Sequence, residues 1–71
     1  MTLNQFKKEL KTLFKVKNQW IYFNDMVNGH LVRLQFFNKY LHVGKIDGYS
    51  LGSIEFKTQK AFIEFLENKL I

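Results

Sequence analysis

The chain has 71 residues and a formal net charge of +5, and 46% of its residues are hydrophobic. It contains no cysteine, which excludes a small secreted domain held by disulfides and favours a cytoplasmic protein. No apolar run approaches the roughly 18 residues of a membrane span, so we expect no membrane partner. With no proline and no low-complexity tract, residues 1–71 are expected to form a single domain.

The positive charge is concentrated near the start of the chain. Five of the eleven Lys and Arg residues lie in the first 17 positions, where Glu9 is the only acidic residue. A patch of one sign raises the local concentration of oppositely charged partners, whereas scattered charge mainly keeps a protein in solution. The asymmetry therefore indicates a class of partner and not a reaction.

The first predicted element is a helix that begins after Thr2, because Thr2 and Gln5 have the spacing of a capping box. Its apolar residues recur at helical spacing and form a stripe about 100° wide: Leu3, Phe6, Leu10, Leu13 and Phe14. The neighbouring flank, here named the lysine stripe, carries Lys7, Lys8, Lys11 and Lys15. We interpret the lysine stripe as a nucleic-acid-binding surface; the plainer alternative is a solvated helix face. Membrane-surface binding is disfavoured, because the apolar stripe is needed to cover a sheet.

From Gln19 the hydrophobic period changes to two, which predicts strands. Three reversals are expected, at Asn28-Gly29, Asn38-Lys39 and Asp47-Gly48. Asn-Gly is the preferred dipeptide of a type I′ hairpin, because both positions need positive φ. The first turn pairs Trp20 with Phe37, Ile21 with Phe36, Phe23 with Leu34 and Asn24 with Arg33. The later turns pair Phe36 with Leu41, Leu34 with Val43, and Leu41 with Ile54.

This register separates the strand residues into two faces. One face is apolar and carries Ile21, Phe23, Val32, Leu34, Phe36, Leu41, Val43, Ile54 and Phe56. The opposite face carries Trp20, Tyr22, Arg33, Gln35, Phe37, Tyr40 and His42. A slip of one residue would invert a strand's faces, so the agreement of three independent turns supports the register. A solvated face is normally polar, and a large aromatic cluster there predicts an interaction surface.

Three interpretations of the aromatic face remain open. Aromatic rings with Arg, Gln and His suit the stacking of single-stranded nucleic acid on a sheet. The same residue types dominate the hot spots of protein interfaces. A third interpretation is that the face is covered, either by a second copy in a homodimer or by a helix folded over it.

Thr58 is expected to cap a last helix with a broad apolar arc: Ala61, Phe62, Ile63, Phe65, Leu66 and Leu70. Neither helix can bury its apolar side alone, so both must pack on the apolar face of the sheet. The predicted fold is therefore α+β, in the order α-β-β-β-(β)-α, with an antiparallel meander sheet and both helices packed on one face.

Catalytic chemistry is poorly supported by the sequence. His30 shares a strand face with Asp25, which allows an Asp-His pair, but a polar hairpin tip explains both residues more simply. His30 and His42 fall on opposite sheet faces and do not make a metal site. No CxxC, HExxH or Gly-rich phosphate loop is present. We therefore expect no enzyme activity, no cofactor and no metal.

The order helix, antiparallel strands, helix resembles the double-stranded RNA-binding domain and the HicA-type toxin ribonucleases built on it. The resemblance implies RNA contacts at Lys7, Lys8 and Lys11, at His30 after the first hairpin turn, and at Lys57 and Lys60 around the start of the last helix. The chain departs from that family in lacking the Gly-Pro-x-His loop, and in having Phe62 and Phe65 where the family has alanines. It also lacks the His-centred motif of the ribonucleases.

The leading hypothesis is a small, basic, non-enzymatic module that binds DNA or RNA through the lysine stripe, with the aromatic face as a second contact. The alternative is an inhibitor or adaptor that binds another protein through the aromatic face. In size and in its frequent Lys, Asn, Ile and Phe, the chain resembles short accessory proteins of phages and mobile elements, including anti-CRISPR inhibitors.

Overall fold

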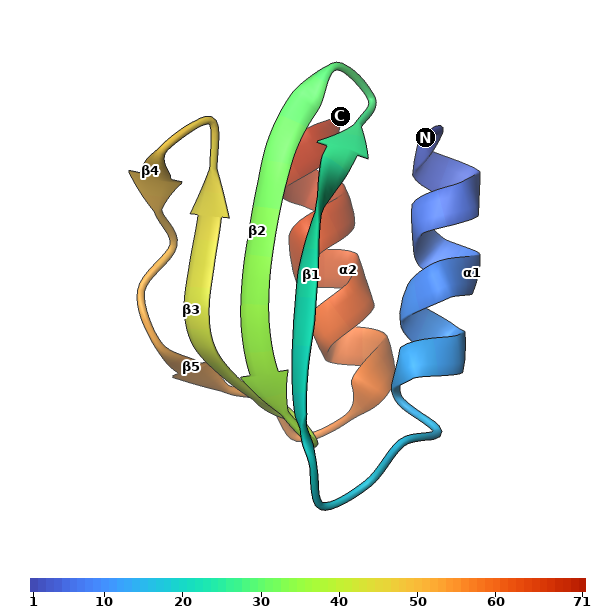
Figure 1. Ribbon diagram of the computed structural model, residues 1–71, viewed down its shortest axis with the longest axis vertical. Coiled ribbons are helices and arrows are strands. Elements are labelled where there is room, and N and C mark those ends of the chain that lie inside the picture. The colour runs from blue at the N-terminus through green and yellow to red at the C-terminus, as the bar shows by residue number, and fades with distance from the viewer.

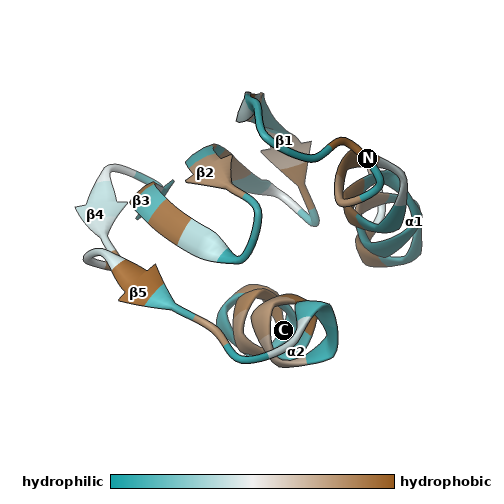
Figure 2. Ribbon diagram, turned by 90° about the horizontal axis from the view of Figure 1, so that it is seen from below, coloured by the Kyte–Doolittle hydropathy of each residue, from teal (hydrophilic) through white to brown (hydrophobic).

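The computed structural model describes residues 1–71 as two helices and an antiparallel sheet (Figure 1). In chain order the elements are α1 (Leu3–Leu13), β1 (Trp20–Val27), β2 (His30–Phe37), β3 (Tyr40–Ile46), β4 (Tyr49–Ser50), β5 (Ile54–Glu55) and α2 (Gln59–Leu70). The strands lie in the order β1-β2-β3-β4, and β5 also pairs with β3. Both helices lie on one side of the sheet, with α1 toward its β1 edge (Figure 2). The predicted fold class and element order are confirmed.

Both helices begin at the predicted caps. The backbone N–H of Gln5 donates to Thr2 Oγ1 at 3.2 Å, and the backbone N–H of Thr2 donates to Gln5 Oε1 at 2.8 Å. Thr58 Oγ1 accepts from the backbone N–H of Ala61 at 3.1 Å. These bonds satisfy donors that a first helical turn leaves free.

The three predicted turns are also present. Asn28, Asn38 and Asp47 all adopt positive φ, between 52° and 53°. Gly29 and Gly48 follow at φ 83°, a region that glycine enters without steric cost. The predicted pairs Trp20–Phe37, Ile21–Phe36, Phe23–Leu34, Asn24–Arg33, Phe36–Leu41 and Leu41–Ile54 are confirmed.

One predicted pair, Leu34 with Val43, is wrong. The register shifts between Gln35 and Phe36, so that Leu34 pairs with Gly44 and Gln35 pairs with Val43. This β-bulge moves Val43 to the face opposite the core, and Gly44 takes the inward position. A Cβ on Gly44 would lie 2.7 Å from Cδ2 of the buried Leu41. A larger residue at the inward position would therefore require the buried Leu41 side chain to move.

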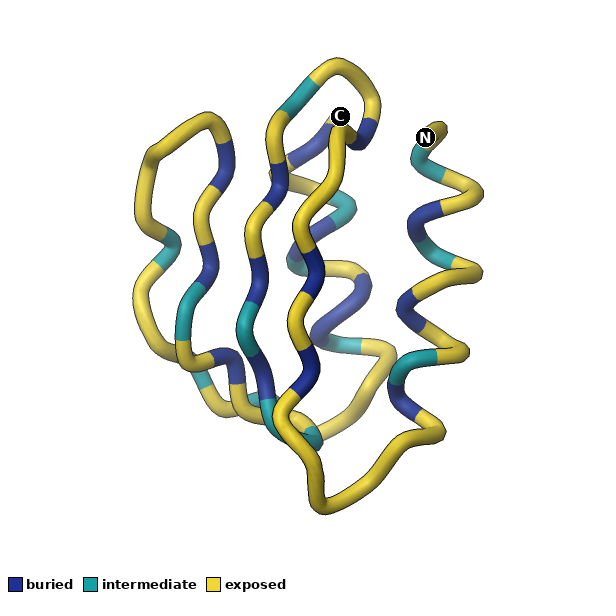
Figure 3. Tube along the Cα trace, in the orientation of Figure 1, coloured by how far each residue is buried: buried dark blue, intermediate teal, exposed yellow.

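The core fills the space between the sheet and the helices, and Figure 3 shows buried positions alternating along the three long strands. Its centre is a group of phenylalanine rings. The Phe62 ring lies 5.0 Å from Phe14 and 5.3 Å from Phe36 between centroids, and Phe6 lies 5.1 Å from Phe23. No polar or charged residue is buried. The inner face therefore has a packing role alone.

The hairpin of β1 and β2 is tied to the ends of both helices. The Met1 backbone nitrogen donates to the Met26 carbonyl at 2.7 Å, and the Asn28 N–H donates to the Met1 carbonyl at 3.0 Å. The Asn28 side-chain amide donates to the Leu70 carbonyl at 2.7 Å. The start of α1, the hairpin turn and the end of α2 are therefore held together.

Candidate functional site

The face of the sheet away from the helices is uncovered, and we call it the outer face (Figure 2). Cross-strand pairing arranges its side chains in four rows. From the β1–β2 turn downward, the rows are Met26–Leu31, Asn24–Arg33–Lys45–Ser50, Tyr22–Gln35–Val43, and Trp20–Phe37–Tyr40–Glu55. All seven residues predicted for this face lie on it, with His42 beside the last row.

The last row carries a group of rings that we call the aromatic cluster: Trp20, Phe37, Tyr40 and His42. The Trp20 ring lies 5.6 Å from Phe37 and 5.5 Å from His42, and His42 lies 6.2 Å from Tyr40. These distances are typical of interacting rings. Trp20 and Tyr40 still expose 44% and 38% of their surface. The cluster is thus preassembled and keeps part of its ring area open to a ligand.

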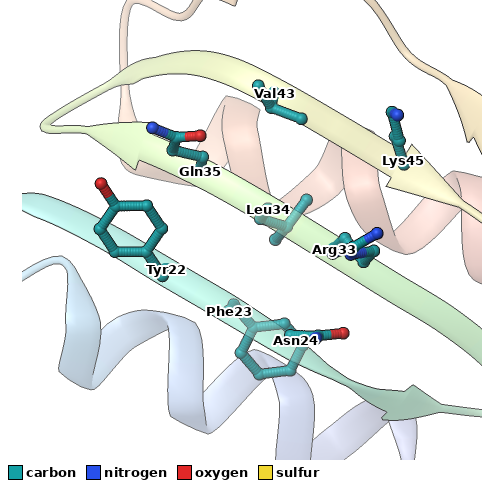
Figure 4. A pocket seen from close by; sticks show the side chains of 8 residues that line it. All are labelled: Tyr22, Phe23, Asn24, Arg33, Leu34, Gln35, Val43 and Lys45. Atoms are coloured by element: carbon teal, nitrogen blue, oxygen red, sulfur yellow. The ribbon is translucent and has the colours of Figure 1, made fainter.

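The two middle rows surround a shallow hollow of about 360 Å³. Figure 4 shows Tyr22 and Gln35 at one end of it, and Arg33 and Lys45 at the other. Val43 lies between these ends because of the bulge. The hollow therefore offers one exposed phenol ring, amide groups that donate and accept hydrogen bonds, and two cations.

The two cations of this hollow have no acidic partner. Arg33 lies directly opposite Lys45 on the neighbouring strand, and like charges in such positions are destabilising. Neither takes part in an ion pair; the ion pairs of the protein are Lys7–Glu67, His30–Asp47 and Lys60–Glu64. Glu55 is the only acidic residue in register with the outer face, at its margin. An anionic ligand would relieve the repulsion between Arg33 and Lys45.

The lysine stripe lies on the helical side of the molecule, across the sheet from the aromatic cluster. Lys7 Nζ is 3.1 Å from Glu67 Oε1, and both side chains are about one-third exposed. A groove between α1 and α2 is lined by this pair and also by Lys11 and Glu64. Lys8 and Lys15 are exposed. The acidic residues of α2 thus offset part of the charge that the sequence places on α1.

A second basic region was not predicted. Lys17, Lys39 and Lys57 line one hollow of about 540 Å³ at the end of the sheet formed by the β2–β3 turn. We call it the lysine hollow. Its other lining residues are Phe14, Asn38, Thr58 and Gln59, so no carboxylate lines it. The three lysines come from separate connections in the chain, and periodicity within one element cannot reveal such a group.

His30 pairs with Asp47 and not with Asp25. His30 Nδ1 lies 2.5 Å from Asp47 Oδ2, and the Leu31 N–H donates to Asp47 Oδ1 at 2.9 Å. These hydrogen bonds, that of His30 first, lower the pKa of Asp47. Asp25 instead accepts from the N–H of its neighbour Met26. The His30–Asp47 pair joins two turns of the sheet and lies outside the outer face.

Two of the groups implied by the RNA-binding resemblance lie at opposite ends of α2. His30 lies at the hairpin held near the end of α2, whereas Lys57 and Lys60 lie at its start. A helix of 12 residues separates its ends by about 18 Å. Comparison of the chain with protein-family models, with curated proteins and with solved structures finds no match.

No three His, Asp or Glu side chains come together as metal ligands would. Neither α1 nor α2 has the length and apolar character needed to cross a bilayer. The hollow of the outer face and the lysine hollow each have lysine or arginine side chains in their lining and no carboxylate.

Proposed function

We propose that this protein is a non-enzymatic module that binds single-stranded nucleic acid on the outer face of its sheet. The observation that carries the proposal is the unneutralised Arg33–Lys45 pair beside exposed aromatic rings on an uncovered sheet face. Cations that track a phosphate backbone and aromatic rings that stack bases are the two general components of single-strand binding.

The components have separate roles on this surface. The aromatic cluster and the exposed Tyr22 ring stack bases, and each stacked base contributes about 1–3 kcal/mol. Arg33 and Lys45 contact phosphates. Gln35 and Asn24 are placed to form hydrogen bonds with the edges of unpaired bases, because the hollow opens between them. Duplex bases are already stacked and paired, so this arrangement favours a single strand.

The lysine stripe has a secondary role in this proposal. Its exposed members, Lys8, Lys11 and Lys15, add to the net charge of +5 and so accelerate the approach of a polyanion. Lys7 is engaged with Glu67. The contact surface itself therefore lies on the sheet and not on α1.

Fluorescence anisotropy with labelled single-stranded DNA and RNA, and with matched duplexes, tests the proposal at several salt concentrations. Tyr22→Ala should weaken single-strand binding by about tenfold. Tyr49→Ala is the matched control, because Tyr49 is 79% exposed and pairs with the inward-facing Ile46. Absence of single-strand binding at low salt, or equal losses in the two variants, would count against the proposal.

A protein partner is the second candidate, and one observation favours it. Met26 and Leu31 face each other on the outer face and are 48% and 40% exposed. Such an aliphatic pair does not help to bind a polyanion but suits an inhibitor or adaptor of the phage type. Met26→Ala should then abolish capture of a partner and leave nucleic-acid binding unchanged. Self-association through the same face would appear as a dimer in light scattering that Phe37→Lys dissociates.

A further inference from the structure

The lysine hollow lies at the end of the molecule where the aromatic cluster ends. The β2–β3 turn consists of Asn38 and Lys39, between Phe37 and Tyr40 of the cluster. One turn therefore contributes to both surfaces. A strand stacked on the cluster needs only to pass over this turn to reach the hollow.

The three lysines are held on a fixed frame. The Asn18 N–H donates to Asn38 Oδ1 at 3.2 Å, which ties the α1–β1 connection to the turn. The Phe56 N–H donates to the Lys39 carbonyl at 2.9 Å, which ties the β5–α2 connection to the same turn. Lys39 Nζ also donates to the Lys57 carbonyl at 3.0 Å. The segments that present Lys17, Lys39 and Lys57 are thus fixed to one another.

The charge of the hollow is not compensated within the protein. None of its lysines belongs to an ion pair, and no acidic side chain lines the hollow. Lys7 and Lys60, in contrast, each have a glutamate partner. Three lysines that line one hollow without a carboxylate complement a polyanion better than they complement a protein surface of mixed charge.

We infer that the lysine hollow binds the backbone phosphates of a nucleic-acid strand as that strand leaves the aromatic cluster. The inference rests on the proposed function and adds a direction to it: bases lie on the outer face, and the backbone continues around the β2–β3 turn toward α2. The strand that this path accommodates is single, because it must bend at the edge of the sheet.

The test compares two double variants with the same loss of charge. Lys17→Gln/Lys57→Gln removes two lysines of the hollow, and Lys8→Gln/Lys69→Gln removes two exposed lysines of the helices. The probe is a labelled single-stranded oligonucleotide of about ten nucleotides. The hollow variant should bind about tenfold more weakly. Its log–log salt slope should fall by about 1.4, because single strands lose about 0.7 per phosphate contact.

A dinucleotide probe separates local contact from general attraction. It is long enough to stack on the aromatic cluster but too short to reach the hollow as well, so the hollow variant should bind it as the control variant does. Circular dichroism verifies that both variants are folded. Equal losses in the two variants with the long probe would overturn the inference and leave the proposed function standing. If the unaltered protein binds no single strand, both proposals fail.

Discussion

The two faces of the sheet are made by alternate residues of the same strands, yet they are under different constraints. On the inner face, Phe36 and Leu41 are buried in the core, so a substitution at either position would cost stability. On the outer face, Trp20 and Tyr22 cover no core and are not needed to exclude water from one. For exposed aromatic residues that lie outside the core, a binding role is the economical explanation.

The largest expected difference is in stability, between a substitution in the core and a substitution on the outer face. Phe62→Ala removes a fully buried ring that contacts three others and should cost about 3–5 kcal/mol. A domain of this size has only about 4–10 kcal/mol in all, so this variant should lose a large part of its stability. Tyr22→Ala should change the free energy of unfolding by less than about 0.5 kcal/mol.

Urea denaturation followed by circular dichroism measures both values. Phe62→Leu keeps most of the volume and should cost no more than about 1.5 kcal/mol, which provides a variant that can be titrated. A Tyr22→Ala loss as large as that of Phe62→Leu would mean that the outer face also supports the fold.

The next largest effect on stability is expected at the β-bulge, which determines which residues of β3 face the core. Gly44→Ala places a Cβ against Leu41, which is itself fully buried, and should cost about 1–3 kcal/mol. In a double-mutant cycle with Leu41→Ala, the two losses should not add, because the second change makes room for the first. Additive losses, or no loss for Gly44→Ala alone, would contradict the steric explanation of the bulge.

A smaller effect is expected in acid at the His30–Asp47 pair. The pKa of Asp47 is lowered in the folded protein, so its contribution to stability is present above the unfolded pKa and is lost as pH falls through the folded pKa. Asp47→Asn should therefore flatten the dependence of stability on pH in the acid range, as pH falls below the ordinary pKa of an aspartate. His30→Ala should remove most of the same dependence. Urea midpoints across this range measure the slope, and an unchanged slope in Asp47→Asn would exclude the pair as its source.

The smallest effect is also the most informative about function. Arg33→Gln removes one of two facing cations and should raise stability slightly, by up to about 0.5 kcal/mol at low salt. The same variant should weaken single-strand binding. Opposite changes in stability and affinity would mean that the cation pair is maintained for a ligand, whereas a loss of stability would indicate a structural partner for Arg33.

Most of the fold was predictable because its signals are local. Thr2, Thr58 and the Asn28-Gly29 turn each specify a short segment without reference to the rest of the chain. The bulge was not predicted, although Gly44 inside a strand was a sign of it. A glycine inside a strand does not always mark a bulge. Here the bulge is explained by the side chain of Leu41, and only the folded structure shows that this side chain lies beside Gly44.

The candidate site was predictable to a lesser extent. Alternation placed Trp20 and Arg33 on the outer face correctly, but the hollow also includes Val43 and Lys45, which depend on the bulge. The lysine hollow joins residues 22 and 18 positions apart, and a sequence contains no measure of that proximity. A dense run of lysines in one helix is easy to see, whereas a group assembled from three connections is not.

The hydrogen bonds of Met1 have a practical consequence for every experiment above. Met1 is hydrogen-bonded to the end of β1 and to the β1–β2 turn, through Met26 and Asn28. A purification tag joined ahead of Met1 would convert a charged amine into a peptide bond and force a new chain past the hairpin. Ile71 is 84% exposed at the other terminus, so tags and fluorophores belong there. If an N-terminal fusion differs from a C-terminal fusion in binding or in unfolding, the cause would therefore be the altered contacts of Met1 and not the ligand surface.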